Sequence, residues 1–157
     1  MGLTVLGTAG TAKGLNLVRK EGAHQAFNHT NASCTEEIMK ETGGRGVDIV
    51  LEMLANVNLS ADMKMLAPNG RVIVIGNRGE ITINARDIMV KRGSIRAFTL
   101  WVVTDSEAAD IFAGLNAGFE NGTLRPVVGK ELPLKDAAQA HVDILAPGAH
   151  GKIALIA

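Results

Sequence analysis

The stretch VDIVLEML, Val47–Leu54, constrains the fold more than any other part of the sequence. It is rich in β-branched residues and apolar on both of the faces that a strand presents. Strands of this kind lie at the centre of parallel sheets, where helices cover both faces. We therefore expect Val47–Leu54 to be a central parallel strand.

Similar apolar runs recur at regular intervals and alternate with amphipathic, charge-bearing stretches, which indicates repeated strand–helix–strand units. Such units, joined by right-handed crossovers, form an α/β fold with a doubly wound, parallel, Rossmann-like sheet. The other predicted strands are Leu3–Leu6, Gln25–Asn28, Arg71–Gly76 and Ser94–Leu100, and the predicted helices are Ala12–Glu21, Thr35–Glu41, Ser60–Leu66 and Ala85–Lys91, with a turn at Pro68–Gly70.

The pattern changes near Gly122–Pro126, after a predicted helix at Ser106–Asn121. We expect residues 1–122 to form a partial dinucleotide-binding domain and residues 123–157 to form an α+β tail. Within the tail the pattern predicts a strand at Val127–Leu132, a helix at Leu134–Leu145 and a last strand, KIALIA, at Lys152–Ala157.

Composition excludes several classes of function. Lys plus Arg and Asp plus Glu number 16 each, so no net charge favours nucleic acid or an acidic membrane. The single cysteine, Cys34, rules out an internal disulfide and argues against a thiolate zinc site. No apolar run reaches the roughly 18 residues of a membrane helix, and no signal-peptide pattern is visible. We expect a soluble, cytoplasmic protein.

The chemistry-bearing residues give no sign of a hydrolase or a metalloenzyme. The four histidines lack metal-ligand spacing, and there is no G-x-S-x-G and no paired carboxylate suited to hydrolysis. We therefore predict no metal site and assign no catalytic side chain.

The loop LGTAGTAKG, Leu6–Gly14, resembles a phosphate-binding loop but fits neither G-x-G-x-x-G nor G-x-x-x-x-G-K-[ST]. NAD-dependent Rossmann enzymes usually place an acid at the end of the second strand, where it binds the ribose 2′-hydroxyl. Here glycine amides, Thr8, Thr11 and Lys13 stand there instead, ahead of a helix start that favours anions. One interpretation is a pocket for a 2′-phosphate, which favours NADPH over NADH; the other is an ordinary glycine-rich turn with a solvated Lys13.

Three further positions are candidates for ligand contact. VIGNRG, Val74–Gly79, follows a strand at the edge where ligands bind in open α/β sheets, and the alternative is a surface turn. Asn56 or Asn58 faces a cofactor or caps the helix predicted from Ser60. His29 either reaches the loop at Gly10 or is structural.

Five stretches together resemble one family: LGTAGTAKGLNLVRKEGAHQAFNH, GVDIVLEMLANVNLS, GRVIVIGNRGEITINARD, LRPVVGKELPL and AQAH. They are similar to the zeta-crystallin group of NADPH-dependent quinone oxidoreductases, in the zinc-free branch of the medium-chain dehydrogenases/reductases. The resemblance runs from Leu3 to Ala157. It implies NADPH contacts at Gly10, Lys13 and His29 near the adenosine phosphate, and at Asn58, Ile75, Gly76, Asn77, Arg78, Phe98, Thr99 and Leu100 along the cofactor.

The resemblance also implies what is absent. Members of this family carry a GroES-like catalytic domain, against which the tail packs, and a first Rossmann strand with its glycine-rich turn. We expect this chain to lack them, as a fragment or an alternative product, which leaves a slot between Leu3–Leu6 and Val47–Leu54. We expect this slot to be filled in one of three ways: by KIALIA, by a partner chain, or by close approach of the two strands.

The sequence thus predicts the NADPH-binding portion of an enzyme that transfers reducing equivalents from NADPH to a quinone. The alternative is a non-catalytic nucleotide- or RNA-binding or structural module, which the resemblance also allows. Ser94–Leu100 reads as an apolar edge strand, through which the family forms homo-oligomers; the alternative is an edge capped by Ser106–Asn121.

Overall fold

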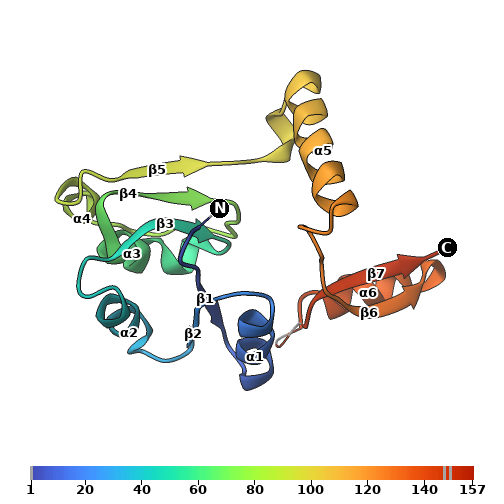
Figure 1. Ribbon diagram of the computed structural model, residues 1–157, viewed down its shortest axis with the longest axis horizontal. Helices are drawn as coiled ribbons and strands as arrows, with labels where there is room; N and C mark the ends of the chain where they lie inside the picture. Colours follow the sequence, from blue (N-terminus) through green and yellow to red (C-terminus); the bar gives the residue numbers. More distant parts are fainter. Residues whose placement is uncertain (1, 147, 149) are drawn as a thin grey trace. The chain divides into compact units, whose positions relative to one another are not determined.

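The computed structural model describes residues 2–146, 148 and 150–157, and it shows an α/β chain whose strands pair in parallel, as predicted. The chain divides into two compact units. One comprises Asn31–Val103, and the other comprises the residues up to Thr30 together with Thr104–Ala157. Figure 1 gives the elements of both in chain order.

The Asn31–Val103 unit is built on a three-stranded parallel sheet in the order β3-β4-β5 (Figure 1). Its helices follow the strand–helix–strand pattern, because each parallel pair needs a crossover between its strands. The elements are α2 (Cys34–Glu41), β3 (Val47–Glu52), α3 (Ala55–Met65), β4 (Leu66–Val74), α4 (Ala85–Met89), β5 (Ser94–Ala97) and a short 3₁₀ turn, η1 (Leu100–Val102).

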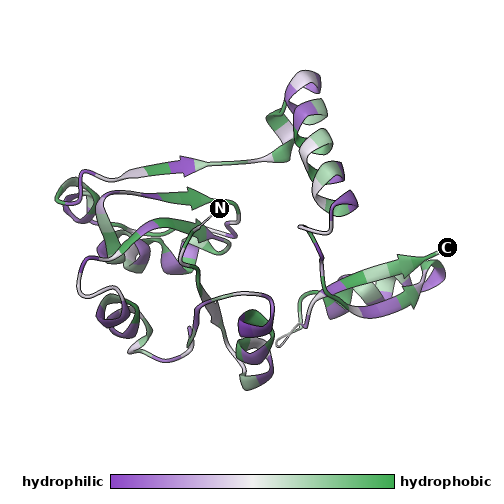
Figure 2. Cartoon of the chain, in the orientation of Figure 1, coloured by the Kyte–Doolittle hydropathy of each residue, from purple (hydrophilic) through white to green (hydrophobic). Residues whose placement is uncertain are grey.

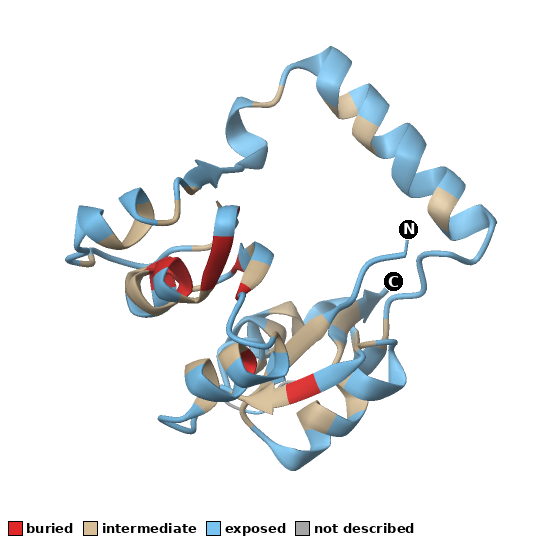
Figure 3. Cartoon of the chain, turned by 60° about the vertical axis from the view of Figure 1, so that its left-hand side comes forward, coloured by how far each residue is buried: buried red, intermediate tan, exposed pale blue. Residues whose placement is uncertain are grey.

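The core of this unit lies between α3 and β4, where its buried residues gather (Figure 3). Met63 and Leu66, at the end of the helix and the start of the strand, have no exposed surface, and Val72 of β4 is equally enclosed. Ala55 and Leu59 complete the cluster. This packing fixes α3 on one face of the sheet.

Several predicted boundaries in this unit are wrong. The third helix starts at Ala55 rather than Ser60, and β5 ends at Ala97 rather than Leu100. The predicted turn at Pro68–Gly70 lies within β4, where the register with β3 jumps and Asn69 has a positive φ of 62°. The strand bulges there because a left-handed residue cannot continue the regular ladder.

The strand β3 is an edge strand of its unit, whereas the sequence predicted a central one. One face packs on α3 through Val50, but Ile49 and Leu51 of the other face are exposed. A strand that is apolar on both faces is expected to be covered on both faces and paired along both edges. Within the described residues of this unit, β3 is paired along one edge and covered on one face.

The other unit begins with β1 (Leu6–Ala9) paired in parallel to β2 (Gln25–Asn28), and α1 (Ala12–Lys20) packs against both. The strand β2 has the predicted bounds, but β1 starts three residues after the predicted Leu3 and extends into the glycine loop. A side chain at Gly7 would overlap Val18, so glycine lets the strand lie directly against α1.

The rest of this unit comprises α5 (Asp105–Glu120), β6 (Val128–Pro133), the 3₁₀ turn η2 (Leu134–Asp136), α6 (Ala137–Asp143) and β7 (Lys152–Ile156). The strand β7 is hydrophobic along most of its length (Figure 2) and pairs in parallel with β6. KIALIA thus forms its ladder within the tail, with β6. The predicted boundary between a dinucleotide-binding domain, residues 1–122, and a tail, residues 123–157, stays a prediction.

Among the described residues, β1 is paired with β2 alone and β3 with β4 alone. Within residues 2–146, 148 and 150–157, no helix has the length and apolarity required to cross a membrane.

Candidate functional site

The carboxyl ends of β3, β4 and β5 lie at one edge of their parallel sheet, which is where open α/β sheets bind ligands. The chain leaves each strand there into a segment that the sequence singled out. Asn58 follows β3 on α3, Ile75–Arg78 follows β4, and Phe98–Leu100 follows β5. The structure thus brings together eight of the eleven predicted contact residues.

Glu52, the last residue of β3, connects these segments. Its backbone carbonyl accepts hydrogen bonds from Ile75 N (2.8 Å) and Gly76 N (3.2 Å). Its side chain, in a residue only 5% exposed, accepts from Leu54 N and from Asn58 Nδ2, the latter at 3.2 Å. Three predicted site residues are therefore held by one glutamate that the sequence analysis did not single out.

Gly76 lies where no larger residue fits. A Cβ at this position would overlap the carbonyl oxygen of Met53, and Gly76 O also accepts from Ala55 N at 3.0 Å. The glycine therefore lets the segment after β4 pack directly on the turn between β3 and α3.

The two asparagines of α3 bind neighbouring groups. Asn56 Oδ1 accepts from Arg78 N at 3.0 Å, whereas Asn58 bonds to Glu52. Both lie inside the helix that begins at Ala55, so the interpretation that they cap a helix starting at Ser60 is wrong. Asn77 Nδ2 donates to Gly79 O at 2.8 Å, which tightens the turn.

The segment after β5 presents apolar surface. Phe98 N donates to Val74 O at 3.0 Å, which continues the β4–β5 pairing by one residue. Phe98 and Leu100 are exposed, and the only tryptophan, Trp101, is 93% exposed. An apolar rim beside polar backbone groups suits a ligand that has a flat ring and hydrogen-bonding substituents.

The structure also buries a carboxylic acid pair that the sequence analysis missed. Asp62, on α3, is 3% exposed, and burial followed by its interaction with Glu52 raises the pKa of Asp62 to about 8. Since both acids are enclosed, the pair is no hydrolytic site. The sequence feature that could have indicated this pair is Glu52 itself, because an acid within the apolar end of a strand is rarely buried without a partner.

This pKa predicts how stability depends on pH. Folded Asp62 binds its proton up to about pH 8, whereas in an unfolded chain it releases it near pH 4. The folded state thus binds more protons between these values, and its free energy of unfolding falls as pH rises, by up to about 1.4 kcal/mol per unit. Chemical denaturation from pH 5 to 8 should show this slope; Asp62→Asn should remove it, and the exposed control Asp110→Asn should not.

In the other unit, Gly10 and His29 lie next to each other, which was one of the two alternatives that the sequence left open for His29. A Cβ on Gly10 would lie only 2.9 Å from His29 Nε2, so glycine lets the loop lie directly against the imidazole. Thr11 Oγ1 caps α1 by accepting from Gly14 N at 3.0 Å. Lys13 is exposed in the first turn of that helix.

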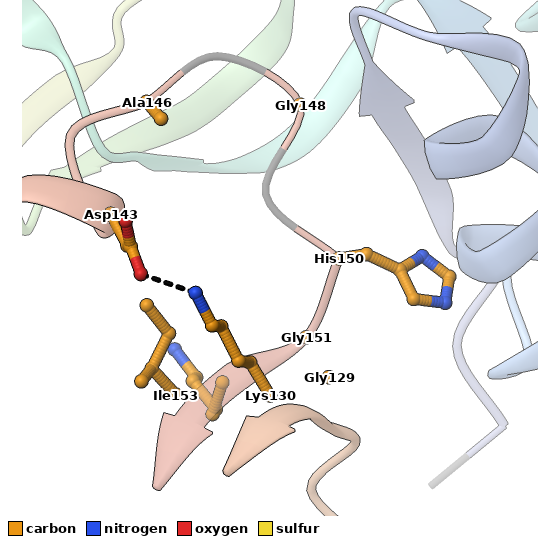
Figure 4. A pocket seen from close by; sticks show the side chains of 9 residues that line it. Gly129, Lys130, Asp143, Ala146, Gly148, His150, Gly151 and Ile153 are labelled. Carbon is orange, nitrogen blue, oxygen red and sulfur yellow. Dashed lines mark hydrogen bonds and ion pairs between the residues drawn. The ribbon is translucent and has the colours of Figure 1, made fainter. Parts of the chain in front are cut away.

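A separate cavity of about 260 Å³ lies in the tail (Figure 4). Lys130 forms an ion pair with Asp143 at this cavity, and Gly129 and Gly151 line it. Since none of the predicted cofactor residues lines it, this cavity does not join the site. The described part of the chain gathers no group of three His, Cys, Asp or Glu residues that could hold a metal ion.

Comparison with known proteins places this geometry in a family. Residues 21–155 match the family described as zinc-binding dehydrogenase. The chain is 50% identical over 156 residues to the quinone oxidoreductase of Sus scrofa and 48% identical to that of Homo sapiens, covering 99% of this chain and 47% of each relative. A 2-haloacrylate reductase from a Burkholderia species is 30% identical over 148 residues, covering 90% of this chain and 44% of its own.

Solved structures agree on the fold. An NAD-dependent alcohol dehydrogenase matches with a TM-score of 0.88 at 28% identity, over 99% of this chain and 44% of its own. A quinone oxidoreductase from Pseudomonas syringae matches with a TM-score of 0.86 at 21% identity, over 99% of this chain and 50% of its own. The chain thus spans about half the length of these relatives. It belongs to the zinc-binding dehydrogenase family, in the group that contains the quinone oxidoreductases.

Proposed function

We propose that this chain is the cofactor-binding portion of a cytoplasmic NADPH-dependent quinone oxidoreductase, which transfers reducing equivalents from NADPH to a quinone. The observation that carries the proposal is the carboxyl edge of β3, β4 and β5, where Glu52 ties Asn58 to Ile75 and Gly76. The identity of about half the residues with quinone oxidoreductases supports the same activity.

One set of residues suits the phosphorylated ribose. Gly10 lets the loop lie directly against His29, whose imidazole is a candidate partner for a phosphate, and Lys13 supplies a cation near the start of α1. The sequence from Leu6 to Gly14 holds no acid that would repel a 2′-phosphate. These features favour NADPH over NADH.

The second set suits the rest of the cofactor. The exposed side chains of Asn58, Asn77 and Arg78 offer hydrogen bonds, and Phe98–Leu100 offers apolar contact. When bound, the cofactor supplies the hydride and thus the redox chemistry. The residues of this chain then bind and orient it, and the apolar rim excludes water. No side chain is required to act as an acid or base.

The direct test follows NADPH oxidation with an ortho-quinone acceptor and titrates NADPH by Trp101 fluorescence. Trp101 is adjacent to Leu100, so its emission reports on this segment. We expect saturable NADPH binding, with turnover below that of a two-domain enzyme. Salt-sensitive binding of a U-rich oligonucleotide without nucleotide binding would instead favour the non-catalytic alternative.

Lys13→Gln is expected to weaken NADPH binding by about tenfold, because one charge-assisted contact to phosphate contributes on the order of 1.5 kcal/mol. NADH binding should be unchanged, since NADH lacks the 2′-phosphate. Lys20→Gln, at the other end of α1, is the matched control. Equal loss of both coenzymes, or loss of neither, would contradict the assignment of Lys13.

We further propose that the chain forms homo-oligomers through the segment Ser94–Leu100. The strand β5 lies at the edge of its sheet, with all four residues exposed. Exposed strand edges readily pair with a second copy. Light scattering should report a mass above the monomer, and a strictly monomeric mass at micromolar concentration would exclude this interface.

A further inference from the structure

The proposed function uses the buried acid Glu52, which holds Asn58 at the carboxyl edge of the sheet, but it gives no role to the second buried acid, Asp62. The residues are 5% and 3% exposed, so both carboxyl groups have left water. Two buried carboxylates this close cannot both carry a charge without a large electrostatic cost. One of them must therefore hold a proton, and the hydrogen bonds indicate which.

In the structure the Glu52 side chain only accepts hydrogen bonds, so the proton belongs on Asp62. Glu52 takes hydrogen bonds from Leu54 N and from Asn58 Nδ2, which are both donors. Asp62 interacts with Glu52 and has one buried oxygen, Oδ2, for which the described residues provide no partner. A protonated Asp62 that donates to Glu52 satisfies this arrangement, whereas an ionised one would repel it.

Asn58 and Asp62 are four residues apart on α3 and therefore lie on the same side of the helix, toward Glu52. A carboxylate accepts but cannot donate, so it fixes the Asn58 amide with its nitrogen toward Glu52. No described residue donates to Asn58 Oδ1, which leaves this oxygen as an acceptor for a ligand.

We propose that Glu52 and Asp62 share one proton and act as a positioning pair, which orients the Asn58 amide so that its oxygen accepts a hydrogen bond from the cofactor. The inference rests on the proposed function, because Asn58 is a predicted cofactor contact. The donor is a hydroxyl or amide N–H of the nucleotide, since Asn58 Oδ1 can only accept.

The other charged groups near Asp62 do not take over the role of Glu52. The elements that pack against α3 are α2, β3, β4 and α4. In the described structure, no other charged residue of these elements, and not Lys64 on α3 itself, makes a hydrogen bond or ion pair with Asp62. The charged residues concerned are Glu36, Glu37, Lys40 and Glu41 on α2, Asp48 on β3, Arg71 on β4, and Arg86 and Asp87 on α4.

The test uses the full chain, Asp62→Asn and the exposed control Asp110→Asn. Asparagine at 62 can still donate to Glu52 but cannot ionise, so it mimics the protonated acid. The first readout is the side-chain amide signal of Asn58, followed by NMR from pH 6.5 to 9.5 without ligand. We expect one transition near pH 8 in the parent chain and in the control, and none in Asp62→Asn.

The second readout is the dissociation constant for NADPH between pH 7 and 9.5, above the second phosphate pKa of about 6. We expect it to rise about tenfold in the parent chain and to stay constant in Asp62→Asn. The proposal would be overturned if the Asn58 amide signal still showed its transition in Asp62→Asn. It would also be overturned if the parent chain bound NADPH saturably with a dissociation constant that did not change with pH. Absence of nucleotide binding at every pH would instead contradict the proposed function, while the amide titration still decides whether the pair holds Asn58.

Discussion

Gly76→Ala is expected to destabilise the Asn31–Val103 unit by about 3 kcal/mol and to weaken NADPH binding at least tenfold. The added Cβ would overlap the carbonyl oxygen of Met53, which is backbone and cannot rotate away. Relief requires the segment after β4 to move from the β3–α3 turn, and this breaks the hydrogen bonds from Ile75 and Gly76 to Glu52. Urea denaturation and nucleotide titration measure the two effects.

Gly79→Ala is the matched control in the same segment. Its added Cβ would lie 3.8 Å from Asn56 Nδ2, an ordinary van der Waals distance. We expect stability within about 0.5 kcal/mol of the parent chain. If Gly76→Ala were as stable as Gly79→Ala, the close packing between the β4 and β3 segments would be wrong.

Met63→Ala is expected to cost about 2–5 kcal/mol of stability, the range for truncating a fully buried large side chain. Met63 has no exposed surface and packs in the cluster with Leu59, Leu66 and Val72. Since net stabilities of domains are about 5–15 kcal/mol, this loss is a large share of the total. Thermal and urea unfolding of the two chains give the difference.

Met89→Ala controls for the change of residue type, because Met89 on α4 is 65% exposed. Its substitution should change stability by no more than about 0.5 kcal/mol. Equal effects at both positions would show that α3 does not pack on β4 as described.

Much of the fold could be predicted because hydrophobic periodicity reports local structure directly. Gln25–Asn28 was predicted at its observed bounds, and α/β class with parallel pairing followed from alternating strands and helices. The start of α3 could not be predicted in this way. Asparagine and serine favour caps in isolation, whereas in the structure Asn56 and Asn58 bond to Arg78 and Glu52, and these tertiary contacts extend the helix back to Ala55.

The same distinction applies to the site. The segments after β3 and β4 could be predicted because parallel strands bring their carboxyl ends to one edge, whereas Phe98–Leu100 was implied by the family resemblance alone. The Glu52–Asp62 pair could not, since the two acids are ten positions apart and meet only when α3 folds back on β3. The apolar character of Val47–Leu54 likewise could not show that β3 would be an edge strand in its unit.

We propose that the glycine loop, Leu6–Gly14, and its neighbours accept a nicotinamide coenzyme that carries a 2′-phosphate. Isothermal titration of the full chain with NADPH and with NADH, at one pH and one salt concentration, tests it most directly. We predict saturable binding of both, with NADPH held at least about tenfold more tightly, as expected for one charge-assisted phosphate contact. Equal affinity for the two coenzymes, or tighter binding of NADH, would contradict the claim.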